Sequence, residues 1–209
     1  MTGLDHLQQW VGRERTLRDE MSAFPARALG AALDHEREPQ AGDALPPGWQ
    51  WLYFLDTPRA SATGPDGHPG LDAASGSFLP PAPLPRRMWA AGAMQIERPL
   101  RLGVPAQRRS VIQSVDAKHG KTGSLFFVNL EHELSQNGQL CIRERQNLVY
   151  REMRTGVSPL PPGERAPEDA DWTQTVIPDP VLLFRYSALT YNGHRIHYDR
   201  NYAVECEFY

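Results

Sequence analysis

The chain has 209 residues, 40% of them hydrophobic and 22% charged, so it can bury the core of one medium domain or of two small ones. A formal net charge of -3 excludes the densely basic surface that binds nucleic acid or an anionic membrane, and neither cysteine lies in a metal or redox pair. The charged N-terminus lacks the apolar core of a signal peptide, and no apolar run reaches about 18 residues, so we expect a cytoplasmic protein with reduced thiols.

Two helices are predicted near the start of the chain. Apolar residues recur at three- and four-residue intervals across residues 4–11, which is the spacing of one helical face. A second helix is expected after Ser22, a suitable N-cap, with Pro25 tolerated in its first turn. The bulky run at residues 49–55 is bracketed by prolines and predicts a buried strand or extended segment.

The middle of the chain changes from loop to strands. Residues 60–87 are dense in proline and glycine, which blocks helix and ladder hydrogen bonds, and an ordered loop of this length is more often functional than not. Asn137-Gly138 then favours a tight hairpin turn between the last two of four strands. Helices segregated from an antiparallel sheet predict an α+β fold. We expect a four-stranded meander over residues 88–98, 108–118, 123–136 and 139–152, with short turns at residues 103–105 and 118–120.

A linker divides this region from the end of the chain. Residues 155–171 are polar and proline-rich, which is the composition of an interdomain linker. Beyond it, residues 172–177 predict a short strand, and an amphipathic helix opens at Asp179, its N-cap. We therefore expect one domain at residues 1–154 and the start of a second at residues 172–209.

The densest group of reactive side chains follows this helix. Asn192, His194 and His197 fall within six residues of one another. Two histidines at this spacing suit a metal, but such a site needs further ligands and a second shell that the sequence does not offer, so we expect neither metal nor cofactor. On composition alone, a surface loop rich in His, Asn and Asp explains the segment equally well.

The order of the residues resembles a known family. The segment YSALTYNGHRIHYDRNYA resembles the hydratase strip of the MaoC-like and type 2 hydroxyacyl-thioester dehydratases, usually YAALSGDxNPxHxDxxYA. Asn192 replaces the usual aspartate, and His194-Arg195 replaces Asn-Pro, as in the branch with mesaconyl-CoA and itaconyl-CoA hydratases. The loop end LPRRMWAAG and the strands after it resemble that branch's N-terminal half. The matching strip positions are Tyr186, Ala188, Leu189, His197, Asp199, Tyr202 and Ala203.

This resemblance implies a fold, a reaction and a partner. The fold is a double hot dog, an antiparallel sheet around a helix, with its second copy incomplete. The reaction is that of a hydro-lyase on an acyl-CoA or acyl-carrier-protein thioester: hydration of an enoyl-CoA or dehydration of a 3-hydroxyacyl thioester, with mesaconyl-CoA a candidate. The family's Pro-Gly-x-x-x-His-Gly segment, whose backbone N–H groups hold the thioester oxygen, is absent, so we expect a truncated chain. A homodimer, or pairing with another hot-dog chain, is expected, and an inactive or partner-dependent thioester-binding subunit remains the alternative.

The resemblance also assigns the catalytic residues. Hydration needs a base for the water and donors for the developing oxyanion. His197 is the implied acid/base group, since a neutral imidazole accepts a proton near neutral pH. Asn192 cannot take a proton but can orient the water through its amide oxygen. Asp199 is assigned the structural role of capping the helix that follows.

Five residues are candidate substrate ligands. Arg195 suits a carboxylate or a coenzyme A phosphate, although pairing with Asp199 is an equal alternative. The two arginines that end the long loop suit coenzyme A phosphates, against the alternative of solvated surface charges. His132 shares a strand face with leucines and is expected to be a core residue. The candidate ligands are Arg195, His194, Gly193, Arg86 and Arg87.

Overall fold

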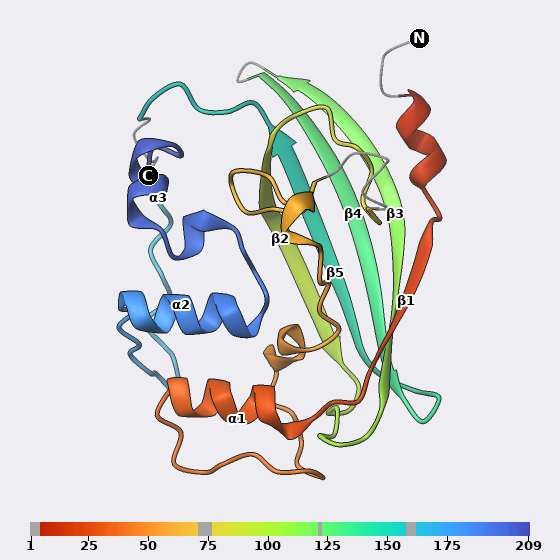
Figure 1. Ribbon diagram of the computed structural model, residues 1–209, viewed down its shortest axis with the longest axis vertical. Helices are drawn as coiled ribbons and strands as arrows, with labels where there is room; N and C mark the ends of the chain where they lie inside the picture. Colours follow the sequence, from red (N-terminus) through yellow and green to blue (C-terminus); the bar gives the residue numbers. More distant parts are fainter. Residues whose placement is uncertain (1–4, 71–76, 121–122, 158–161) are drawn as a thin grey trace.

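The structure is built on one antiparallel sheet. The computed structural model describes residues 5–70, 77–120, 123–157 and 162–209, and within them the sheet has five strands in the order β1-β3-β4-β5-β2 (Figure 1). Every neighbouring pair of strands is antiparallel. The strands are β1 (Glu14–Asp19), β2 (Arg86–Ile96), β3 (Ala106–Gly120), β4 (Gly123–Gln136) and β5 (Gln139–Arg151).

The hairpin between β4 and β5 has the predicted turn. Every second residue of β4 from Phe126 to Gln136 is buried, so one face of this central strand lies on the core. At its end Asn137 and Gly138 have φ values of 50° and 74°, the left-handed values that a two-residue hairpin turn requires. The predicted hairpin and the bounds of β4 are confirmed.

The order of the strands differs from the predicted meander. β3, β4 and β5 follow one another as expected, but β2 pairs with β5 and not with β3, so the prediction was wrong for its first strand. A strand that was not predicted, β1, pairs with the other edge of β3. Its sequence ERTLRD has one large apolar residue, which leaves no alternating signal. The turn expected at residues 118–120 lies inside β3.

Short helices lie near opposite ends of the sheet (Figure 1). The first predicted helix is a 3-10 helix, η1 (Asp5–Trp10), and the second is α1 (Ala23–Ala32), with Ser22 at its N-cap. The strand predicted at residues 49–55 is wrong, because η2 (Trp49–Leu52) occupies this segment. Gly48, at a φ of +84°, turns the chain so that Trp49 N–H donates to the carbonyl of Pro46.

The core has two parts. One lies between α1, η2 and the nearby ends of the strands, and the other lies under η1 and the central strands. The first includes Met21, Leu29, Tyr53, Phe54 and Leu134. The second includes Leu7, Phe78, Ile112, Phe126 and Tyr150.

The last part of the chain returns to the sheet. Residues 155–157 and 162–179 have no regular structure, so the strand predicted at residues 172–177 is wrong, and Trp172 and Ile177 there are 75% and 81% exposed. Helix α2 (Pro180–Leu189) begins as predicted, with Asp179 accepting a hydrogen bond from Leu182 N–H at 2.7 Å. It packs beside α1 (Figure 1). The division at a linker stays a prediction.

Two short helices end the described chain, η5 (Arg195–His197) and α3 (Arg200–Glu205), and both lie on the side of the β2 edge (Figure 1). A third short 3-10 helix, η3 (Ala60–Ala62), opens the loop that leads to β2. Among the described residues, no helix combines the length and the apolarity needed to cross a membrane.

Candidate active site

The strip that follows α2 is shaped by a reversal of the chain. Tyr191 has a left-handed φ of 50°, and Asn192 N–H donates to Ser187 O at 2.8 Å, which closes the end of the helix. The side-chain oxygen of Asn192 accepts the backbone N–H of His194 at 3.1 Å. The amide oxygen predicted to orient water therefore also holds the turn that presents His194.

Asp199 and Arg195 organise the other end of the strip. Asp199 caps α3 by accepting a hydrogen bond from Tyr202 N–H at 3.0 Å, as predicted. Its second oxygen accepts hydrogen bonds from Arg195 Nε and Nη2 at 3.1 and 2.9 Å. The Arg195–Asp199 pair, one of the two alternatives for this arginine, is present.

The long loop that precedes β2 docks on the strip. The segment from Gly64 to His68 forms a tight turn, closed by Gly64 N–H to His68 O at 2.8 Å. Arg195 N–H donates to Asp66 O at 2.9 Å, and Arg195 Nη1 donates to Pro65 O at 3.2 Å. Gly67 lies against the backbone of Gly193, where a Cβ on either glycine would collide with the other's carbonyl oxygen.

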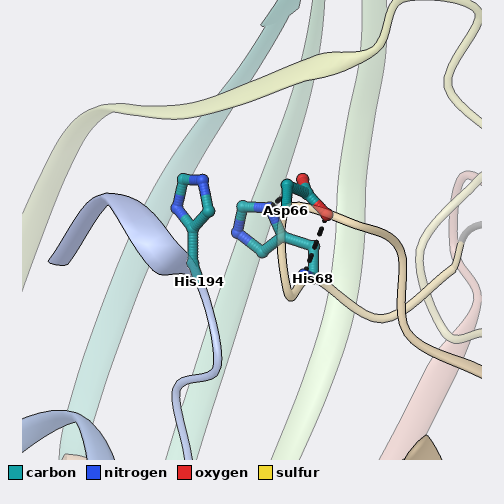
Figure 2. A group of neighbouring side chains, drawn as sticks. All are labelled: Asp66, His68 and His194. Atoms are coloured by element: carbon teal, nitrogen blue, oxygen red, sulfur yellow. Dashed lines mark hydrogen bonds and ion pairs between the residues drawn. The ribbon is translucent and has the colours of Figure 1, made fainter. Parts of the chain in front are cut away.

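This contact brings three imidazole rings and a carboxylate together. His68 Nδ1 lies 3.0 Å from Asp66 Oδ2, and Asp66 Oδ1 accepts the backbone N–H of His68 at 3.0 Å. The His68 ring stacks on the ring of His194, with centroids 3.8 Å apart. Figure 2 shows His194 on one side of His68 and Asp66 on the other. The ring of His197 lies edge-on to His194, with centroids 5.4 Å apart.

Burial and mutual proximity keep these rings neutral. Burial, followed by the charges of His68 and His197, lowers the pKa of His194 to about 3. Burial also lowers the pKa of His68, although Asp66 opposes this shift, and partial burial lowers the pKa of the more exposed His197. The hydrogen bond from His68 lowers the pKa of Asp66 to about 2. Near neutral pH the cluster is therefore one carboxylate beside neutral imidazoles with basic lone pairs.

The two arginines that end the loop have different surroundings. Arg87 is half-buried, and its charge helps to lower the pKa of both His68 and His194, so it lies near the cluster. Arg86 is only 3% exposed, and its Nε lies 2.6 Å from Glu207 Oε2. The alternative of a solvated surface charge is wrong for Arg86, and the role of both arginines at a coenzyme A phosphate stays a prediction.

Asp66, His68 and His194 are also the one group in the described part of the chain whose spacing suits a metal ion, with ligand atoms within 4.8 Å of one another. A zinc ion needs lone pairs that converge on one point at about 2.0–2.2 Å. Here the two imidazoles stack face to face, and Asp66 Oδ2 is engaged with His68 Nδ1. The arrangement fits a hydrogen-bonded pair better than a set of metal ligands.

Sequence reasoning did not single out Asp66 and His68. The signal available was the segment TGPDGHPG inside a loop whose length indicated a function. His132, in contrast, is the core residue that was predicted, because it is buried and its Nδ1 lies 2.7 Å from Ser110 Oγ. Burial lowers the pKa of His132 to about 4.

The docked loop and the histidine-rich strip bring a carboxylate and neutral imidazoles together, an arrangement that suits acid/base chemistry. The family model for hydroxyacyl-thioester dehydratase type 2 matches residues 48–209. A mesaconyl-C(4)-CoA hydratase of Chloroflexus aurantiacus is 44% identical over 201 residues, which cover 96% of this chain and 70% of that protein. The mitochondrial hydroxyacyl-thioester dehydratase type 2 of Schizosaccharomyces pombe is 27% identical over 187 residues, which cover 79% and 61%.

The fold agrees with these matches. A solved MaoC-like dehydratase superposes with a TM-score of 0.58 at 12% identity, covering 96% of this chain and 72% of that chain. The chain belongs to the hydroxyacyl-thioester dehydratase type 2 family, whose members are hydro-lyases of acyl thioesters. The predicted family, the α+β hot-dog fold and the hydro-lyase class are confirmed, while the roles of single residues remain predictions.

Proposed function

We propose that this chain hydrates, reversibly, a short dicarboxylic enoyl-CoA of the mesaconyl-C4-CoA kind. The observation that carries the proposal is the 44% identity to the Chloroflexus hydratase along 96% of the chain. Such a substrate has a free carboxylate at the end of its acyl group, and a guanidinium is a suitable partner for it. Arg87 lies near the histidine cluster, and its guanidinium forms no ion pair with a carboxylate of the described residues. Arg86 and Arg195, in contrast, pair with Glu207 and Asp199.

His197 is the general base of the proposed reaction. It is exposed, so substrate can reach it, and its lowered pKa leaves the ring neutral near neutral pH. It takes a proton from water while the water oxygen bonds to the β-carbon and the double-bond electrons move to the α-carbon and the thioester oxygen. Asn192 orients that water, because its amide retains a second lone pair and two N–H donors beyond the bond to His194.

The test compares substrates on one preparation of the purified chain. Mesaconyl-C4-CoA, itaconyl-CoA and crotonyl-CoA are incubated separately, the loss of enoyl absorbance is followed, and the products are identified by mass spectrometry. We expect mesaconyl-C4-CoA and itaconyl-CoA to be hydrated with a higher kcat/KM than crotonyl-CoA, because only a dicarboxylic acyl group uses Arg87. Equal or better turnover of crotonyl-CoA would refute the dicarboxylic substrate, and a folded chain that hydrates none of them would refute the activity.

The second candidate is a thioester-binding subunit that works only with a partner. Large apolar side chains are exposed on α2 and on the segment before it, among them Trp172, Ile177, Val181 and Phe184. Several exposed large apolar residues along one segment are typical of surfaces that another chain covers. We propose pairing with a second copy or with another hot-dog chain. Light scattering alongside the activity assay separates the candidates: an active monomer excludes the partner-dependent subunit.

A further inference from the structure

The strip of this chain lacks the carboxylate that its family form carries, because Asn192 stands at the position of the usual aspartate. An amide cannot exchange a proton during a reaction. Adding water to an enoyl thioester involves two proton transfers, one from the water and one to the α-carbon. With His197 assigned to the first, a separate group for the second transfer has to come from another residue, because Asn192 cannot be that group.

The docked loop brings a carboxylate back to the strip. Asp66 lies on a turn that is fixed to the strip by the Arg195 N–H bond to Asp66 O and by the close approach of Gly67 and Gly193. The carboxylate itself contacts His68 through both oxygens, one on the ring and one on the backbone. Backbone contacts with the strip therefore fix the turn that carries the pair.

The hydrogen bond sets the chemistry of the His68 ring. A carboxylate at Nδ1 accepts the N–H there, which leaves Nε2 as the nitrogen that gains and loses a proton. An aspartate placed in this way also stabilises the imidazolium when the ring is protonated, as in other Asp–His pairs of acid/base enzymes. The stack of His68 on His194, and the edge contact of His194 with His197, connect this ring to the proposed base.

We propose that Asp66 and His68 form the second acid/base couple of this site, with His68 giving the proton to the α-carbon. This inference rests on the proposed hydration. As the water oxygen bonds to the β-carbon, His197 takes one proton of the water, and the electrons of the double bond pass to the α-carbon. The protonated form of His68, a minor form near neutral pH that its pairing with Asp66 stabilises, gives its proton to that carbon. The proton on His197 then returns through water to His68, and the net change is the addition of one water.

Other charges face His68 and bear on its titration. Arg87 on β2 disfavours its protonated form, while Asp66 on its own loop and Glu207 after α3 favour it. His194 and His197 on the strip are neighbours that compete for the same proton. Removing the charge of Asp66 therefore lowers the pKa of His68. Since the reaction uses protonated His68, the alkaline side of the rate profile moves to lower pH.

The experiment uses the full chain with His68→Gln and Asp66→Asn, and with Asp34→Asn as the matched control. Asp34 is exposed, and its left-handed φ of 54° suits asparagine. The hydration of mesaconyl-C4-CoA is measured across pH, with circular dichroism to confirm folding. We expect His68→Gln to lower kcat by about 100-fold or more with little change in KM. Asp66→Asn should lower kcat less and move the alkaline limb to lower pH, and Asp34→Asn should match the parent.

Two further readouts sharpen the test. In deuterated water, the exchange of the α-hydrogens of the hydrated product should be lost in His68→Gln, since that step needs the proton of His68. Metal analysis of the parent should find no stoichiometric ion. An ion that the parent binds and that Asp66→Asn loses would overturn the couple in favour of a metal site.

An active parent whose folded variants keep the parental rate and pH profile would overturn the couple and leave the proposed hydration standing. A parent that hydrates no thioester would overturn both.

Discussion

Replacing Gly67 with alanine tests whether docking of the loop on the strip builds the site. At a φ of +86°, an alanine is strained by roughly 1–2 kcal/mol, and its Cβ would collide with the carbonyl oxygen of Gly193. The loop has to lift away, which breaks the contacts of Arg195 with Asp66 O and Pro65 O. At about 1 kcal/mol for each hydrogen bond, this adds roughly 2 kcal/mol to the strain.

The chain offers a matched control in Gly12. Its φ is +82°, so Gly12→Ala carries the same backbone strain, but a Cβ there meets no atom within 4 Å. Relative to Gly12→Ala, we expect Gly67→Ala to melt about 4–8 °C lower, as follows from roughly 2 kcal/mol in a chain of this size. The kcat for mesaconyl-C4-CoA should fall about 100-fold, because His68 leaves the cluster. Equal melting temperatures and equal kcat for the two variants would refute the docked loop as part of the site.

Three further predictions follow from the same contacts. Arg86→Met leaves Glu207 charged and buried without its partner, so urea unfolding should show that the free energy of unfolding falls by about 3–5 kcal/mol. Adding Glu207→Gln should recover part of this loss, and a loss below about 1 kcal/mol would contradict the buried pair. His194 binds a proton more readily in the unfolded chain, where a histidine has its ordinary pKa of about 6.5, than in the folded chain, where burial lowers the pKa to about 3. The stability that depends on a neutral, buried His194 ring is therefore complete above about pH 6.5, and it is lost progressively as the pH falls toward about 3. Melting temperatures at several pH values should fall less steeply on acidification for His194→Gln than for the parent, and parallel curves would contradict the buried neutral ring. Phe184→Ser on the exposed face of α2 should shift any dimer seen by light scattering toward monomer, while an unchanged mass would place the contact elsewhere.

The features that were predicted correctly depend on short stretches of sequence. Asn137 and Gly138 adopt left-handed backbone angles at low cost, so their dipeptide identifies the hairpin without reference to the rest of the chain. Asp179 and Asp199 cap the helices that begin at the next residue, since their side chains reach the N–H groups of the first turn. The strip was found for the same reason, because its residues lie within one continuous segment.

The features that were missed depend on contacts between distant segments. The pairing of β2 with β5 is set by packing across the whole sheet, and no local pattern encodes it. At the site, His68 and His194 stack although 126 residues separate them in the chain. A histidine in a Pro/Gly-rich loop has no local feature that identifies its partner, so the Asp66–His68 pair becomes visible only once the loop is placed on the strip.

His197 is the proposed base with which the strip hydrates an enoyl thioester. The most direct measurement is the rate of hydration of mesaconyl-C4-CoA by the parent chain and by His197→Ala, at equal concentration and with melting curves recorded for both. His6→Ala, at an exposed histidine away from the strip, is the matched control. We predict turnover by the parent and by His6→Ala, and a loss of at least about 100-fold in kcat for a folded His197→Ala. A folded parent without turnover, or a His197→Ala variant at the parental rate, would contradict the claim.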